Sequence, residues 1–82
     1  MSVRIVDPAR IVLEGACPAE DAETLLGHLC AHPGARVDWR GCESAHAAVV
    51  QVLLATGVVL HGPPAGRFLR SLVAPALKNS QE

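Results

Sequence analysis

The sequence predicts a small α/β protein in which a mixed sheet of about four strands carries helices packed on it. Two observations predict this class. Runs rich in Val and Ile alternate along the chain with stretches whose apolar residues recur at helical spacing. The connections between them are short and contain Gly and Pro. Because 82 residues cannot form two cores, we expect a single domain over 1–82, with a polar tail at 78–82.

The first half predicts a hairpin followed by a helix. Residues 3–6 and 10–15 are rich in Val and Ile, which favours strands, and the Asp-Pro-Ala sequence at 7–9 favours a turn. A connection this short predicts an antiparallel pair. A helix is expected from about Pro18 to residue 30, because apolar residues recur at i, i+3, i+4, i+7 and i+8, and His-Pro-Gly at 32–34 ends it.

The second half predicts two further strand-and-helix pairs. Residues 35–39 favour a strand, and Ser44 is the expected N-cap of a largely apolar helix from 45 to about 55. Residues 58–61 are apolar on both sides, which is typical of a central parallel strand. A last helix is expected at about 65–77, giving the order ββαβαβα. Its inward-facing residues are predicted to be Phe68, Leu69, Leu72 and Ala76, and Pro75 should kink it.

Composition argues against nucleic acid and membrane partners. The formal net charge is −1 and the aromatic residues are Trp39 and Phe68, so neither a basic footprint nor a base-stacking platform is expected. The apolar stretch at 45–60 is interrupted by polar residues and is shorter than the roughly 20 residues that a membrane span needs, so direct membrane insertion is not expected. The first residues lack the pattern of a secretory signal, and three cysteines without a CxxC pair suit a reducing compartment. These features predict a cytoplasmic protein.

Residues 37–42 read Val-Asp-Trp-Arg-Gly-Cys and precede a second, apolar helix. STAS domains (sulfate transporter and anti-sigma factor antagonist) have a strand of the form apolar-Asp-apolar-x-Gly-apolar. An Asp-Ser-Ser-Gly or Asp-Ser-Ala-Gly turn begins eight residues after that Asp. In this strand, in its order of elements and in its apolar second helix, the chain resembles a short form of the STAS family over residues 3–77. Asp38, Gly41 and Cys42 match the strand. His46 and Ala47 occupy the positions of the turn's Asp and of the Ser that is phosphorylated in the antagonists.

The resemblance implies a non-catalytic regulatory protein-binding module of bacterial signal transduction. Its partner would be an anti-sigma factor or kinase, or a sensor kinase. Because Ala47 has no hydroxyl group, we expect either constitutive docking or control by phosphorylation of Ser44. An alternative within the same fold is an accessory STAS subunit of an ABC transporter, bound to its ATPase subunit. A homodimer is also compatible with the sequence.

We expect the partner to bind where the third strand meets the second helix. The candidate residues are Asp38, Trp39, Arg40, Glu43, Ser44, His46 and Ala47. Trp39 and Arg40 belong to residue types enriched at interface hot spots, although Trp39 could equally fill the core. Ser44 is either an ordinary N-cap or a phosphoacceptor. His46 is either a surface residue or a contact that responds to pH or accepts phosphate.

Enzymatic readings have less support. A small thiol- or metal-dependent enzyme could use Cys42, His46 and Asp38, but a chain this short has little structure with which to enclose a pocket. Paired carboxylates at Asp38 and Glu43 lack a third group that would complete a reaction centre. The histidines at 28 and 32 have i, i+4 spacing without the glutamate of the zinc-protease motif. We therefore expect no catalytic residues, no metal and no cofactor.

Overall fold

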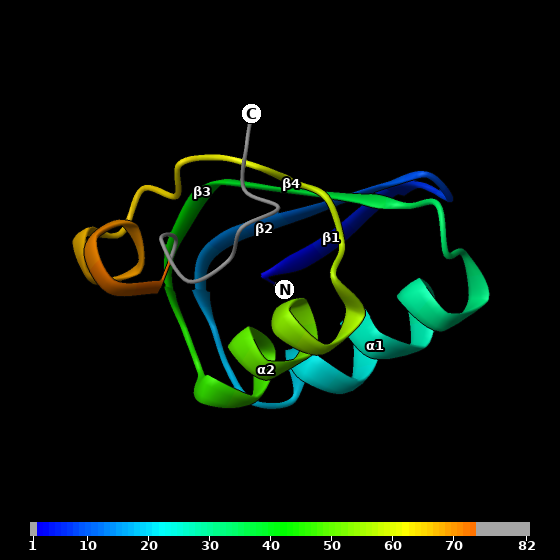
Figure 1. Cartoon of the computed structure of the whole chain (residues 1–82), viewed down its shortest axis with the longest axis horizontal. Coiled ribbons are helices and arrows are strands. Elements are labelled where there is room, and N and C mark those ends of the chain that lie inside the picture. The colour runs from blue at the N-terminus through cyan, green and yellow to red at the C-terminus, as the bar shows by residue number, and fades with distance from the viewer. Residues whose placement is uncertain (1, 74–82) are drawn as a thin grey trace.

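A computed structural model describes residues 2–73, in which a single sheet carries two helices on one of its faces (Figure 1). The elements in chain order are β1 (Val3–Asp7), β2 (Arg10–Cys17), α1 (Asp21–Ala31), β3 (Arg36–Ala45), α2 (Ala47–Thr56), β4 (Leu60–His61) and η1, a short π-helix (Leu69–Val73). No helix in this part of the chain is long and apolar enough to cross a bilayer.

The sheet is mixed and has the strand order β1-β2-β3-β4. β1 pairs with β2 in the antiparallel direction, whereas β2–β3 and β3–β4 are parallel. The predicted class, a small α/β fold with a four-stranded mixed sheet and a hairpin at its start, is confirmed. The position predicted for residues 58–61 is wrong. β4 contains only Leu60 and His61 and lies at the edge of the sheet, because no further strand in residues 2–73 pairs with it.

Alternation along the strands separates a core face from an open face. Ile11 and Leu13 of β2 and Val37 of β3 are fully buried against the helices, as the period of two requires. The helices cover them with Leu25 and Leu29 of α1 and with Val49 and Leu53 of α2, all of which are buried. Side chains at the intervening strand positions lie on the other face, where Figure 1 shows no helix between residues 2 and 73.

The start of α2 differs from the prediction. Ser44 is not its N-cap, because Ser44 pairs with Ala16 and Ala45 pairs with Cys17, so the β2–β3 ladder continues through the expected turn. The cap is His46, whose ring nitrogen Nδ1 accepts a hydrogen bond from the backbone N–H of Ala48. At the other end Gly57 adopts a left-handed conformation with φ 62°, which Gly tolerates without a Cβ clash.

The chain after β4 runs along the outer side of β3. Gly66 lies against the backbone of Glu43, and its N–H donates to the carbonyl oxygen of Cys42 at 3.0 Å. Leu69 is buried as predicted, but Phe68 is 65% exposed, so the prediction that it faces inward is wrong. The predictions for Pro75, Ala76 and the tail at 78–82 fall outside the described residues, and that for Leu72 concerns a side chain outside the description.

Candidate docking surface

The structure divides the predicted partner-binding residues into three groups. Trp39 is fully buried in the core and cannot contact a partner directly. Of the two readings of Trp39, core filling is therefore the one observed. Asp38 and Arg40 lie on the open face of the sheet. The remaining residues are exposed around the end of β3 and the start of α2. Together with Arg40 they form what we call the junction surface: Arg40, Glu43, Ser44, His46 and Ala47.

Backbone hydrogen bonds hold the junction on both sides. On one side β3 pairs with β2 as far as Ala45, and the N–H of His46 donates to the carbonyl oxygen of Cys17 at 2.9 Å. On the other side, Gly66 pairs with Cys42. The β2–β3 register shifts twice, once between Val12 and Glu14 and once between Gly15 and Ala16. Such irregularities change which way the neighbouring side chains point and often occur at functional sites.

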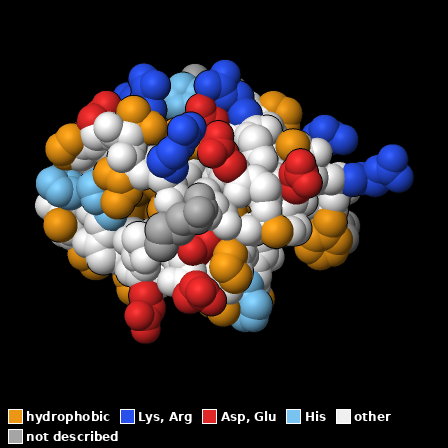
Figure 2. Space-filling view, turned by 180° about the vertical axis from the view of Figure 1, so that it is seen from behind, with side chains coloured by type: hydrophobic (Ala, Val, Ile, Leu, Met, Phe, Trp, Pro, Cys, Tyr) orange, Lys and Arg blue, Asp and Glu red, His pale blue; other side chains and the backbone are white. Residues whose placement is uncertain are grey.

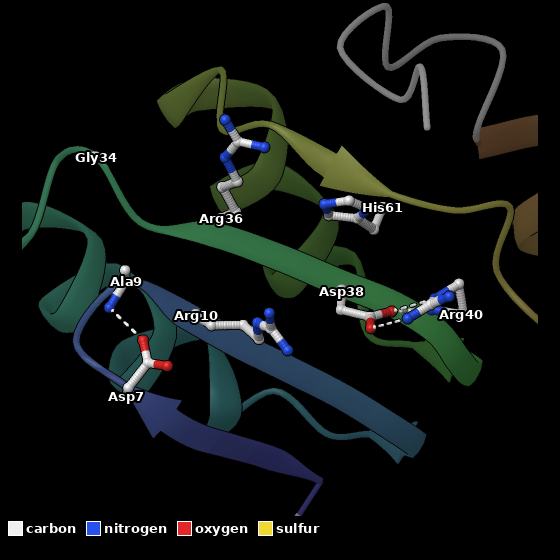
Figure 3. A pocket seen from close by; sticks show the side chains of 8 residues that line it. All are labelled: Asp7, Ala9, Arg10, Gly34, Arg36, Asp38, Arg40 and His61. Atoms are coloured by element: carbon white, nitrogen blue, oxygen red, sulfur yellow. Dashed lines mark hydrogen bonds and ion pairs between the residues drawn. The ribbon is translucent and has the colours of Figure 1, made fainter.

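Asp38 is tied to Arg40. Its Oδ1 accepts hydrogen bonds from the backbone N–H and the Nε of Arg40, and its Oδ2 lies 2.7 Å from Nη2 (Figure 3). Hydrogen bonding to Arg40 lowers the pKa of Asp38 from 3.8 to about 2. An ionised, fully engaged carboxylate is a poor general acid and has little freedom to bind a metal. We therefore assign Asp38 to the positioning of Arg40.

The cysteines give little support to a thiol enzyme. Cys42 is buried and its Sγ lies 3.8 Å from Sγ of Cys17, which is buried too. Their hydrogen bond raises the pKa of Cys42, with burial as the second cause, and lowers the pKa of Cys17. A nucleophilic cysteine needs an accessible thiolate, and Cys42 has neither access nor a lowered pKa. The described residues also contain no group of three metal-ligating side chains.

The paired histidines of α1 have a structural partner. His28 Nε2 lies 3.0 Å from the carbonyl oxygen of Pro8, and the ring centroids of His28 and His32 are 4.5 Å apart. The contact with Pro8 links α1 to the β1–β2 turn. This contact accounts for His28 without a metal.

The open face carries a charged hollow that the sequence interpretation missed. Every arginine of the strands lies on this face: Arg4, Arg10, Arg36 and Arg40. A hollow of about 320 Å³ over β2, β3 and β4 is bordered by Arg10, Arg36, Arg40, Asp38 and His61, with Asp7 at its rim (Figure 3). Figure 2 shows basic and acidic side chains mixed on the side of the molecule where the sheet lies. Because Ile11, Val37 and Trp39 face the core, the charged residues between them had to share the other face, and this alternation was readable from the sequence.

No protein-family model matches the chain, no curated protein matches it, and no solved structure matches it.

Proposed function

We propose that the protein is a non-catalytic regulatory module that docks to a signalling protein through the junction surface. The observation that carries the proposal is an exposed surface whose backbone is hydrogen-bonded on both sides. Glu43, Ser44, His46 and Ala47 are exposed, while the backbone that bears them is hydrogen-bonded to Cys17 on one side and to Gly66 on the other. A surface that is ordered before binding loses little conformational entropy on association.

The side chains of the junction surface favour binding over chemistry. Ser44 provides the hydroxyl group of this surface. Nδ1 of His46 accepts a hydrogen bond from the backbone N–H of Ala48. A nucleophile needs a base within hydrogen-bonding distance, and the described residues show no hydrogen bond between Ser44 and His46. The mixed charges of Arg40 and Glu43 are instead suited to a polar rim that selects a partner of complementary charge.

The class of partner comes from the resemblance to the STAS family. On that basis we expect an anti-sigma factor with kinase activity or a sensor kinase. Ser44 is exposed, and its hydroxyl makes no hydrogen bond within residues 2–73. A phosphate there would add about two negative charges beside Glu43. The added charge would make the surface more negative and would repel Glu43. Phosphorylation of Ser44 would therefore change the affinity for a partner of complementary charge.

Site-specific cross-linking tests the surface with a matched pair of positions. Ala47 and Ala55 are both exposed and lie at opposite ends of α2. A photo-reactive amino acid at position 47, introduced in the source organism, should capture a defined protein, whereas the same group at position 55 should not. Equal capture at both positions, or capture at 55 alone, would contradict the proposed surface.

The captured partner is then purified and its affinity measured by calorimetry. Glu43→Lys should weaken binding at least tenfold, because a reversed charge faces the partner's complementary surface. Glu23→Lys provides the control, since Glu23 is an exposed glutamate in the first turn of α1. If Glu43→Lys binds like the parent protein, the junction surface is not the docking site.

A further inference from the structure

The hollow on the open face contains two arginines of neighbouring strands that form no ion pair within residues 2–73. Arg10 of β2 and Arg36 of β3 are partners in the parallel register, so they are lateral neighbours on the same face. Like charges placed opposite each other destabilise a pair of strands. Neither guanidinium lies within 4.0 Å of a carboxylate in residues 2–73. The sheet therefore carries an unfavourable pair at this position.

The other arginines of the face differ from this pair. Arg4 forms an ion pair with Glu14 at 3.2 Å, and Arg40 forms one with Asp38 at 2.7 Å. Each of these carboxylates offsets one guanidinium. The contrast shows that carboxylates can be accommodated on this face. Arg10 and Arg36 form no ion pair with a carboxylate of the described residues, unlike Arg4 and Arg40.

The remaining groups around the hollow leave room for an anion. Asp7 is the register partner of Arg10 on β1, but it forms no ion pair with it, and its Oδ1 accepts the N–H of Ala9. Asp38 is already paired with Arg40. His61 is the register partner of Asp38 on β4, and its ring adds a hydrogen-bonding group. Three arginines thus face two carboxylates around a hollow of about 320 Å³. That volume lies at the small end of ligand sites, so the ligand would be small.

We propose that this hollow binds a tetrahedral oxyanion of the phosphate class between Arg10 and Arg36, with His61 as an additional donor. Adjacent strands are roughly 5 Å apart, so one ion can reach the guanidinium groups of both. Each guanidinium can donate two parallel hydrogen bonds. A carboxylate has only two oxygens and saturates one such fork, whereas a phosphate offers enough oxygens for both. Figure 3 shows the Arg10 side chain over β2 and the Arg36 side chain extending toward the β4 side, so the two guanidinium groups turn toward each other when they share one ion.

The phosphate could be the free ion or a phosphoryl group on a small carrier, and the experiment separates these sources. Backbone amide shifts of the purified protein are followed by NMR while potassium phosphate replaces chloride at constant ionic strength. Parallel titrations use O-phosphoserine and acetate. We expect saturable shifts around Arg10, Arg36 and His61 with phosphate and weaker shifts with acetate. Tighter binding of O-phosphoserine than of phosphate assigns the site to carried phosphoryl groups, and the reverse order assigns it to the free ion.

Three single variants locate the site. Arg10→Gln and Arg36→Gln should each weaken phosphate binding about tenfold, the usual contribution of a charged hydrogen bond. Arg4→Gln is the matched control, because Arg4 lies on the same face but is paired with Glu14, and it should change the affinity less than about twofold. Each variant should keep the parent's amide spectrum away from the substitution, because all three side chains are exposed.

Two results would overturn the proposal. One is the absence of saturable shifts with both phosphate and O-phosphoserine. The other is a sign of general charge attraction, seen either as acetate binding as tightly as phosphate or as equal losses of affinity in Arg4→Gln and Arg36→Gln. The test needs no protein partner, so its failure leaves the junction surface unaffected. Failure of the cross-linking experiment likewise leaves the anion site unaffected.

Discussion

Gly62 lies directly against the indole ring of Trp39. A Cβ atom at position 62 would overlap Nε1 of that ring, so only glycine fits there without movement. Trp39 is fully buried and has little freedom to shift. We expect Gly62→Ala to lower the free energy of unfolding by about 1–3 kcal/mol, the usual cost of overpacking. Urea denaturation followed by Trp39 fluorescence measures the change.

Gly27→Ala is the control for this substitution. Gly27 lies within α1, and an added Cβ would meet no atom within 4 Å. Because alanine favours the helix over glycine, Gly27→Ala should raise the free energy of unfolding by about 0.5–1 kcal/mol. If both substitutions stabilise the protein, the close contact between Gly62 and Trp39 is wrong.

The cap of α2 can be improved. His46 caps the helix through Nδ1, but aspartate and serine are stronger N-caps and aspartate also interacts favourably with the helix dipole. We expect His46→Asp to raise the free energy of unfolding and His46→Ala to lower it, each by about 1 kcal/mol. Thermal unfolding of the two variants beside the parent protein checks the order. An alanine variant as stable as the aspartate variant would show that position 46 is not a cap.

The pair formed by Asp38 and Arg40 makes stability depend on acid pH. The pKa of Asp38 is about 2 in the folded protein, below its ordinary value of 3.8. Because the pKa is lower in the folded protein, the ionised carboxylate stabilises the fold at any pH above its unfolded-state pKa. This contribution to the free energy of unfolding is lost as the pH falls from about 4 through 2. In Arg40→Gln the carboxyl should titrate nearer 3.8, and this part of the acid loss should disappear. NMR titration of the Asp38 side chain and denaturation between pH 2 and 5 provide the measurements.

Alkylation by iodoacetamide should distinguish the three cysteines. Cys30 is exposed, whereas Cys17 and Cys42 are buried. The native protein should therefore take up one adduct, on Cys30, and the unfolded protein three. The Cys30→Ser variant should remain unmodified until it is denatured. Rapid modification of Cys42 in the native variant would revive the reading of a thiol enzyme.

Phosphorylation of Ser44 can be tested by phosphopeptide mass spectrometry on protein isolated from its source. A phosphate on Ser44 under some growth conditions, together with altered partner affinity in Ser44→Glu, is the expected result. If the residue is never modified and Ser44→Glu binds like Ser44→Ala, control at this residue is excluded. Docking would then be constitutive.

Local patterns were enough to predict most of the fold. The hairpin, α1, α2 and the mixed sheet followed from apolar periodicity and from Gly and Pro positions, whereas the helix expected at 65–77 is, in the described residues, the short π-helix Leu69–Val73. The start of α2 did not, because the length of β3 depends on pairing between Ser44 and Ala16, which are far apart in sequence. The prediction of a central position for residues 58–61 was wrong for the same reason, because the order of strands depends on pairing across the whole sheet.

The candidate site was predictable in part. Trp39 lies two residues after Val37, and this spacing already placed both side chains on the core face. Tryptophan is also common at protein interfaces, and for that reason Trp39 was predicted to bind a partner. Arg10 and Arg36 belong to different strands, and only the register brings them together. Phe68 was expected to face inward together with Leu69, yet of these two only Leu69 is buried.

The alternation of the strands gives the protein two nearly independent sets of positions. Ile11, Leu13, Val37 and Trp39 maintain the scaffold, whereas Arg10, Asp38 and Arg40 face outward from the same strands. Arg10 and Arg40 are exposed, so replacing them removes little buried surface and binding specificity can diverge with little penalty in folding. A combinatorial library confined to the outward positions would consequently yield mostly folded members, which makes this small sheet a usable framework for selecting new ligands.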